Sequence, residues 1–205
     1  MIRKIYRNLF LQREKFIMKI LNGGSNDFYQ SLKELNIKGL RNTDERFEKY
    51  KLKNILKEDF EVLDIGCNKG FFSIVTSRFV KNVTGVDNKF INIQIGKQAM
   101  KKLNIENVKL IKKDFKKFKT SKKFDLIYSF AIHHWVGLSF ENYIKKINTF
   151  LKKDGIIVFE SHDLDTLDLY LEPKLKIFKE LGFKEIFKTK EYENGKRVTI
   201  IFKKQ

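Results

Sequence analysis

Five short apolar runs alternate with longer, mixed segments through the middle of this chain. The runs cover residues 62–65, 83–86, 108–111, 124–128 and 155–159. Runs of this length are typical of buried strands, and their alternation with helix-length segments favours a parallel α/β sheet. The spacing predicts helices over about 70–80, 89–103, 138–151 and 166–181.

Two further runs near the end of the chain predict a hairpin. They cover about 183–190 and 196–203 and flank the segment 193–196, which contains an Asn-Gly pair. Asn-Gly is a strong signal for a tight turn between antiparallel strands. The sheet is therefore expected to end in an antiparallel pair.

The first fifty residues have a different pattern. Residues 2–21 place apolar side chains at near-helical spacing between basic ones, and 22–26 form a Gly-rich break. A basic amphipathic helix can lie on a membrane, but we expect this one to pack on its own domain. Residues 27–50 are expected to be irregular to helical, with Thr43 as an N-cap. These features predict an N-terminal helical extension over 1–50 and a main domain over 51–205.

Length and composition narrow the class of protein. A chain of 205 residues suits one well-buried domain. No apolar run reaches about 18 residues, and the single cysteine excludes an internal disulfide or a multi-cysteine zinc site. We expect a soluble cytoplasmic protein that does not enter a membrane. The sequence does not indicate an oligomeric state.

The net charge of +18 raises the possibility of RNA binding. However, 36 of the 43 basic residues are Lys and only seven are Arg. Phosphate recognition more often uses the guanidinium fork. The pattern therefore favours a solvated lysine-rich surface, and RNA remains the second choice as a partner.

The most informative segment is 62–70, Val-Leu-Asp-Ile-Gly-Cys-Asn-Lys-Gly. A strand ending in Asp64 leads into a glycine loop, Gly66–Gly70, and then into a helix. This order opens a nucleotide-binding βαβ unit, because glycine lets the backbone approach a ligand closely. Cys67 in this loop has no neighbouring base, so we expect a small buried residue and not a nucleophile.

Polar residues follow each of the five predicted parallel strands. They are Asp64, Asp87, Asp114, Ser129 and the triplet Glu160-Ser161-His162. Open α/β sheets bind ligands at the carboxyl ends of their strands. The sequence therefore predicts a binding site at this edge.

This set of motifs resembles the class I S-adenosylmethionine (SAM) dependent methyltransferases from about residue 60 to 202. The residues that carry the resemblance are Asp64-Ile-Gly66-Cys-Asn68-Lys-Gly70, Asp87, Asp114-Phe115, the segment 124–135 and Leu151-Lys-Lys-Asp-Gly155. The middle glycine of the family loop is Asn68 here, and Asn tolerates a left-handed backbone. A dehydrogenase is disfavoured because the Gly-x-Gly-x-x-Gly spacing is absent.

The resemblance implies a Rossmann-like seven-stranded sheet of order 3-2-1-4-5-7-6, with the last strand antiparallel and helices on both faces. It also implies SAM as cofactor. Asp64 and the loop 66–70 would hold its methionyl and ribose parts, and Asp87 the ribose hydroxyls. The expected cofactor-binding residues are Asp64, Gly66, Cys67, Asn68, Gly70, Asp87, Asn88, Asp114, Phe115, Ser129, Phe130 and Arg46. Arg46, or alternatively Arg41, would pair with the cofactor carboxylate.

All three histidines, His133, His134 and His162, follow the fourth and fifth strands. A His of near-neutral pKa suits removal of a proton from an acceptor. We expect His134 or His162 to be the general base, with Glu160 at the same edge, and His133 to bond its loop. A metal at the cluster is the alternative. No metal is expected, because the Glu-x-x-His pair of the methyltransferases that act on RNA 3′ ends is absent: position 130 is Phe.

The resulting expectation is methyl transfer to an oxygen or nitrogen of a small metabolite or sugar intermediate. Phe28, Tyr29, Trp135 and the N-terminal extension would shape the acceptor pocket. RNA, and tRNA in particular, is the alternative acceptor. A non-catalytic module that binds SAM or a protein partner is the further alternative.

Overall fold

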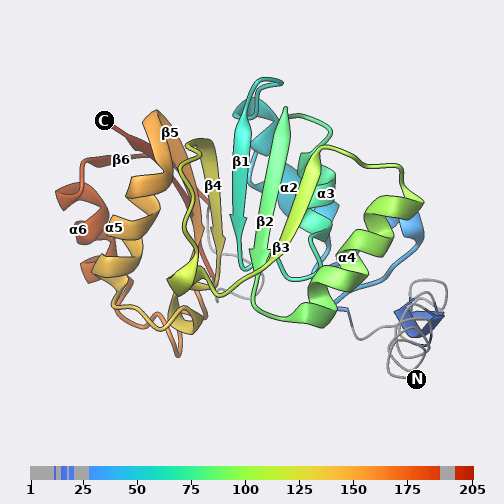
Figure 1. The fold of residues 1–205 in the computed structure, drawn as a ribbon. Coiled ribbons are helices and arrows are strands. Elements are labelled where there is room, and N and C mark those ends of the chain that lie inside the picture. Colours follow the sequence, from blue (N-terminus) through green and yellow to red (C-terminus); the bar gives the residue numbers. More distant parts are fainter. Residues whose placement is uncertain (1–11, 13–14, 18, 21–27, 190–196) are drawn as a thin grey trace.

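The chain forms one seven-stranded sheet with the strand order β3-β2-β1-β4-β5-β7-β6 (Figure 1). The computed structural model describes residues 12, 15–17, 19–20, 28–189 and 197–205. The strands are β1 (Glu61–Ile65), β2 (Asn82–Asp87), β3 (Val108–Lys112), β4 (Phe124–Phe130), β5 (Leu151–Glu160), β6 (Phe183–Lys188) and β7 (Thr199–Lys204). The first five pair in parallel, and β7 is antiparallel to β5 and β6. The predicted sheet order and the antiparallel last strand are confirmed.

Helices cover both faces of the sheet, as predicted. They are α2 (Thr43–Lys49), α3 (Phe71–Thr76), α4 (Phe90–Lys102), α5 (Phe140–Phe150) and α6 (Leu171–Glu180). Buried residues of α2, α3 and α4 form one hydrophobic core, and those of α5 and α6 form a second core on the opposite face. Figure 1 shows α5 and α6 near one end of the sheet and α4 near the other.

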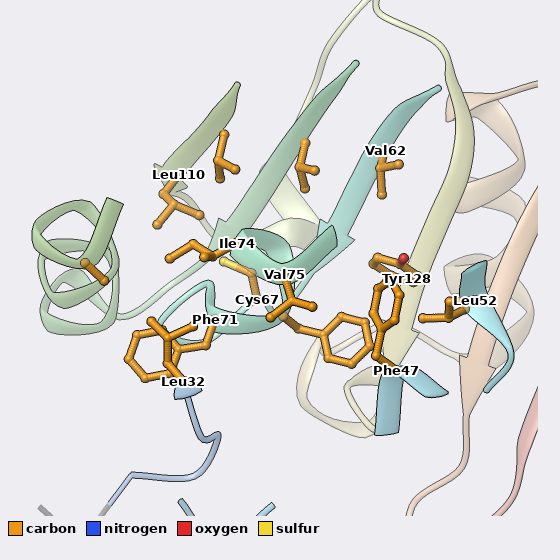
Figure 2. Close-up of a cluster of buried hydrophobic side chains, with 14 of the residues drawn as sticks. Leu32, Phe47, Leu52, Val62, Cys67, Phe71, Ile74, Val75, Leu110 and Tyr128 are labelled. Carbon is orange, nitrogen blue, oxygen red and sulfur yellow. The ribbon is translucent and has the colours of Figure 1, made fainter. Parts of the chain in front are cut away.

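The central strands are apolar at successive positions because both of their faces are covered. Val62 of β1 belongs to the first core and its neighbour Leu63 to the second. Figure 2 shows the first core, where Val62 and Tyr128 of the sheet face the helix α3, which contributes Phe71 and Val75. Strands buried on both faces read as continuous apolar runs, which is why these runs were visible in the sequence.

Two local predictions are wrong. The N-cap of α2 is Asn42, whose side chain accepts a hydrogen bond from the Glu45 amide at 3.2 Å. Thr43 is instead the first residue of the helix, and its hydroxyl donates to the Ser31 carbonyl oxygen at 2.7 Å. In addition, β5 begins at Leu151, directly after α5, and not at Gly155.

Most of the N-terminal helix predicted over 2–21, and the turn at 193–196, lie outside the described residues. The described positions of that helix are helical, and Ile17 is buried in the first core. Residues 28–50 also pack against this core, through Phe28, Leu32 and Phe47 among others. Within the described ranges, every helix is too short or too polar to cross a bilayer.

Candidate functional site

A cavity of about 650 Å³ lies at the carboxyl ends of the parallel strands. In Figure 1 the arrowheads of β1 and β2 point to this same edge of the sheet. The charged and polar residues that line it are Tyr29, Gln30, Arg46, Asp64, Asn68, Asp87, Asn88, Lys89, Asn92, Lys113, Asp114, His162 and Arg197. The volume falls within the range of about 300–1,000 Å³ that small-molecule sites occupy.

The glycine loop turns through three left-handed residues, of which Gly66 and Asn68 line the cavity. The backbone φ angles of Gly66, Asn68 and Gly70 are 67°, 55° and 70°. Asn68 therefore holds the conformation that was expected to let it replace glycine. Its amide donates to the Asp87 carboxylate at 3.0 Å, which ties the loop to the end of β2.

Asp64, at the end of β1, is buried in the cavity wall. Its carboxylate accepts a hydrogen bond from the Ser73 hydroxyl at 2.6 Å. Burial raises the pKa of Asp64 to about 7, although Ser73 and the charge of Arg46 act in the opposite direction. An acid with so little hydrogen bonding gains from a cationic or donor group of a ligand.

Asp87 and Asp114 line the same cavity in better-satisfied surroundings. Asp87 accepts from the amides of Asn68 and Lys89 and from the Asn92 side chain at 3.2 Å. Asp114 accepts from the Lys116 amide at 2.8 Å. These bonds fix the direction of each carboxylate and leave acceptor capacity for a ligand, because a carboxylate has about four lone-pair sites.

Arg46 of α2 is 1% exposed and lies in the cavity wall. It donates from Nη2 to Glu160 at 3.0 Å and from Nε to Tyr50 at 3.1 Å. Its guanidinium also lies over the Phe130 ring, 5.0 Å from the centroid. Its Nη1 is buried and has no hydrogen-bond partner among the described residues. A buried unpaired donor is costly, so a ligand that places an acceptor oxygen, such as that of a carboxylate, beside this atom would be favoured.

Glu160, at the end of β5, is fully buried, and its carboxylate pairs with three guanidinium groups. Arg41 forms a fork with it at 2.7 and 3.1 Å, and Arg46 and Arg197 approach at 3.0 and 3.3 Å. The Tyr50 hydroxyl donates to it as well. Burial alone would raise the pKa of Glu160, but the charges of Arg46 and Arg41 hold it well below its usual range.

Tyr29 completes this cluster on the cavity side. Its hydroxyl oxygen accepts from Arg41 at 3.0 Å and from Arg197 at 3.2 Å. Burial raises the pKa of Tyr29, but the charge of Arg41 and its hydrogen bond outweigh that effect and lower it. The segment 28–50 thereby closes one side of the cavity and is tied to the ends of β5 and β7.

The three histidines come together beyond β4 and β5, as expected. Their ring centroids lie 4.3 to 4.9 Å apart. His162 lines the cavity, and its Nε2 is buried without a partner among the described residues. Burial, together with His133 and His134, lowers the pKa of His162 to about 4, so its imidazole is neutral at pH 7.

His133 and His134 face Asp168, which lies between β5 and α6. Their Nε2 atoms are 3.1 and 3.0 Å from Asp168 Oδ1. These three side chains are, within the described part of the chain, the group that could hold a metal ion. However, the Lys174 ammonium pairs with Asp168 and lies 3.2 Å from His134 Nε2. A lysine therefore supplies a positive charge within this group.

The cavity contains most, but not all, of the residues expected from the sequence. Those that line it are Arg46, Asp64, Gly66, Asn68, Asp87, Asn88, Asp114, Phe115, Phe130 and His162. Those that lie outside its wall are Cys67, Gly70, Ser129, His134 and Glu160. The side chain of Cys67 is buried in the first core, and burial raises the pKa of its thiol. Ser129 is buried and bonded to the Tyr143 hydroxyl at 2.8 Å.

Arg197 and Asp168 were missed by the sequence analysis. Neither belongs to a recognisable motif. A signal for Arg197 was present, because it is one of seven Arg in a chain with 36 Lys. Where lysine is so prevalent, an arginine points to a need for the guanidinium fork.

Comparison with known proteins gives the family. The model of the family described as "Methyltransferase domain" matches residues 56–202. The N-methyltransferase NodS from Bradyrhizobium japonicum WM9 superposes with a TM-score of 0.66 at 20% identity, covering 78% of this chain and 96% of NodS. The same protein in complex with S-adenosyl-L-homocysteine (SAH) superposes with a TM-score of 0.66 at 18% identity, covering 78% of this chain and 86% of that one.

Two curated relatives carry different acceptor names. The chain is 31% identical over 112 residues to malonyl-[acyl-carrier protein] O-methyltransferase 2 of Ilyobacter polytropus, covering 54% of this chain and 42% of that protein. It is 28% identical over 155 residues to ribosomal protein L11 methyltransferase of Thermosipho africanus, covering 75% of this chain and 54% of that protein. The chain thus spans about half the length of these relatives.

The residues present fit SAM. The cavity offers a buried guanidinium nitrogen, unpaired among the described residues, for its carboxylate, and acids at the carboxyl ends of three consecutive strands for its amino and hydroxyl groups. With its sheet order and its match over 56–202, the chain belongs to the methyltransferase domain family, among the class I SAM-dependent methyltransferases.

Proposed function

We propose that this chain methylates a nitrogen or oxygen atom of a small acceptor molecule. The observation that carries the proposal is one cavity holding Asp64, Asp87, Asp114 and the unpaired Nη1 of Arg46. SAM supplies an electrophilic methyl group, whose bond to sulfur breaks as the bond to the acceptor forms. The chain supplies mainly proximity and alignment, which contribute much of the rate in such displacements.

The cofactor-binding residues are assigned by their surroundings. Arg46 pairs through Nη1 with the cofactor carboxylate. Asp64 receives its ammonium, which favours the ionised form of this acid. Asp87 accepts from the ribose hydroxyls, and Asp114 accepts from the adenine amino group next to Phe115.

His162 is our choice for the general base among the residues expected to be catalytic. It lines the cavity, its imidazole is unprotonated at pH 7, and its Nε2 is unpaired among the described residues, although its lowered pKa makes it a weaker base than an ordinary histidine. In the tautomer protonated on Nδ1, this nitrogen accepts the acceptor's proton. His134 is bonded to Asp168, and Glu160 is bonded to three arginines, so we assign both to positioning.

The shape and lining of the cavity support a small acceptor over RNA. Trp135 and Leu167 line it, are 69% and 45% exposed, and give its mouth an apolar surface. NodS and the named relatives are methyltransferases whose names give different acceptors. Their names therefore do not indicate the acceptor of this chain, and we infer it from the residues that line the cavity. The alternatives are an RNA acceptor, supported by the net charge of +18, and a module that binds SAM without catalysis.

The experiment is a methyl-transfer screen with labelled SAM against small amines, hydroxy compounds and RNA. We expect turnover of a small compound, little change between about 50 and 200 mM salt, and no loss on adding a chelator. His162→Gln should lower the rate by roughly 100-fold or more with little effect on SAH binding, whereas the matched His134→Gln should act less strongly.

Steep salt dependence and turnover of RNA would favour the RNA acceptor. A loss of activity with chelator would assign a metal to the group around Asp168. SAH binding without turnover of any compound would favour the non-catalytic module.

A further inference from the structure

The charged groups around the cavity are unevenly distributed. The carboxylates of Asp64 and Asp87 lie at the carboxyl ends of β1 and β2, and Asp114 follows β3. The remaining wall, formed by segment 28–50 and by the residues at the ends of β4, β5 and β7, carries the cations Arg46 and Arg197 and no lining carboxylate among the described residues. This second part is the wall we assign to the acceptor.

Within the described residues, the arginines that line this wall outnumber the carboxylates that pair with them. Glu160 is the carboxylate that pairs with Arg41, Arg46 and Arg197. Arg46 and Arg197 both line the cavity, and among the described residues this single carboxylate pairs with both of them. Buried charges are tolerated when they are paired, so a surplus of this kind indicates that anionic ligands belong here.

The cofactor accounts for part of this surplus only. Its carboxylate is assigned to Nη1 of Arg46, and it also brings a sulfonium and an ammonium group. The wall beside Arg197 therefore stays positive when the cofactor is bound. Arg197 is held by Tyr29 and Glu160, and its side chain is 27% exposed, so it is accessible from the cavity.

Tyr29 adds a hydrogen-bond donor at the same place. Its oxygen already accepts from Arg41 and Arg197. Its own proton must therefore point away from both guanidinium groups, and the structure shows no acceptor for it among the described residues. Tyr29 lines the cavity, so this proton is available to an anion placed beside Arg197.

We infer that the methyl acceptor is a small organic acid whose carboxylate is bound by Arg197 and the Tyr29 hydroxyl, beside His162. This inference rests on the proposed function and adds the substrate class. A carboxylate suits the guanidinium fork, and the apolar surfaces of Trp135 and Leu167 suit the carbon skeleton of such an acid. His162 then lies next to the acceptor's reacting atom.

The test is calorimetric titration of the SAH-saturated protein at constant ionic strength. Benzoate and acetate are the anionic probes, and benzamide and acetamide are their uncharged counterparts. We expect at least one acid to bind, and its amide to bind about tenfold more weakly or worse. Inorganic phosphate is titrated in parallel.

Two variants locate the site. Arg197→Gln should weaken acid binding by about tenfold or more, and Tyr29→Phe by a smaller factor, while SAH affinity stays within about twofold. Arg78→Gln is the matched control, because Arg78 pairs with Glu34 at the surface and lies outside the cavity wall. It should change neither affinity.

Several results would overturn the inference. They are equal binding of acid and amide, no binding of any acid, and unchanged acid binding in Arg197→Gln. Binding of phosphate in place of the acids would assign a phosphorylated acceptor instead. If SAH itself fails to bind the wild-type protein, the proposed function fails, and the inference falls with it.

Discussion

Asp64 and Asp87 end adjacent strands of the sheet, yet their surroundings give them different chemistry. Asp87 is held by two amides and an amide side chain. Asp64 is buried and bonded by one hydroxyl, so its pKa rises to about 7. The same contrast separates the histidines, because Nε2 of His162 is buried without a partner among the described residues, whereas Nε2 of His134 lies 3.0 Å from Asp168. Residue type alone therefore does not assign a role at this edge.

The raised pKa of Asp64 makes the stability of the unliganded protein depend on pH. Because the folded-state pKa lies above that of an unfolded aspartate, the stabilising effect of the proton is present below about pH 4. It is lost as the pH rises through about 7. Asn does not ionise, so the variant Asp64→Asn does not lose stability at this position as the pH rises. The variant should gain stability relative to wild type by roughly 2–3 kcal/mol between pH 5 and pH 8.

Urea unfolding of both proteins at pH 5 and pH 8, without cofactor, measures this difference. A stability difference that stays constant between the two pH values would show that Asp64 is already ionised at pH 5.

At the scale of elements, one side chain connects the N-terminal segment to the sheet. Glu160 ends β5, and its partners Arg41 and Arg46 lie 119 and 114 residues before it in the chain. Together with Tyr50 and Arg197, these bonds hold segment 28–50 and the start of β7 against the cavity. We therefore regard Glu160 as the residue that positions this wall.

Glu160→Gln removes the negative charge that pairs with the guanidinium groups of Arg41, Arg46 and Arg197. Glu160→Gln should lower the free energy of unfolding by about 3–5 kcal/mol, the usual cost of breaking a buried ion pair. Glu141→Gln is the control, because Glu141 forms an exposed pair with Lys145 on α5 and should change stability by less than about 0.5 kcal/mol. Urea unfolding at pH 7 measures both. Equal, small effects would mean that the cluster does not hold this wall in place.

At the scale of the whole molecule, the sequence predicted what depends on local pattern. The apolar runs located the strands, and the acids after them located the cavity, because the carboxyl ends of parallel strands meet at one edge. The left-handed Asn68 was also foreseeable, since few residues tolerate that backbone. The sheet order came from the family resemblance.

What the sequence did not reveal depends on contacts between distant segments. Nothing near Glu160 in the chain indicates that Arg41, Arg46 and Arg197 surround it. Likewise, the position of the Lys174 ammonium, next to His134 and Asp168, depends on how α6 packs on the sheet. Burial and ion pairing of this kind determine which polar residue can react, and they exist only after folding.

The carboxyl edge of this sheet is expected to bind SAM through the acids at the ends of its strands. The most direct test of this binding is calorimetric titration of SAH into wild-type protein, Asp87→Ala and the control Asp59→Ala, an exposed acid before β1. We predict micromolar binding to wild type and to the control, and a loss of about tenfold or more in Asp87→Ala. No binding to wild type, or equal binding to all three proteins, would contradict the account.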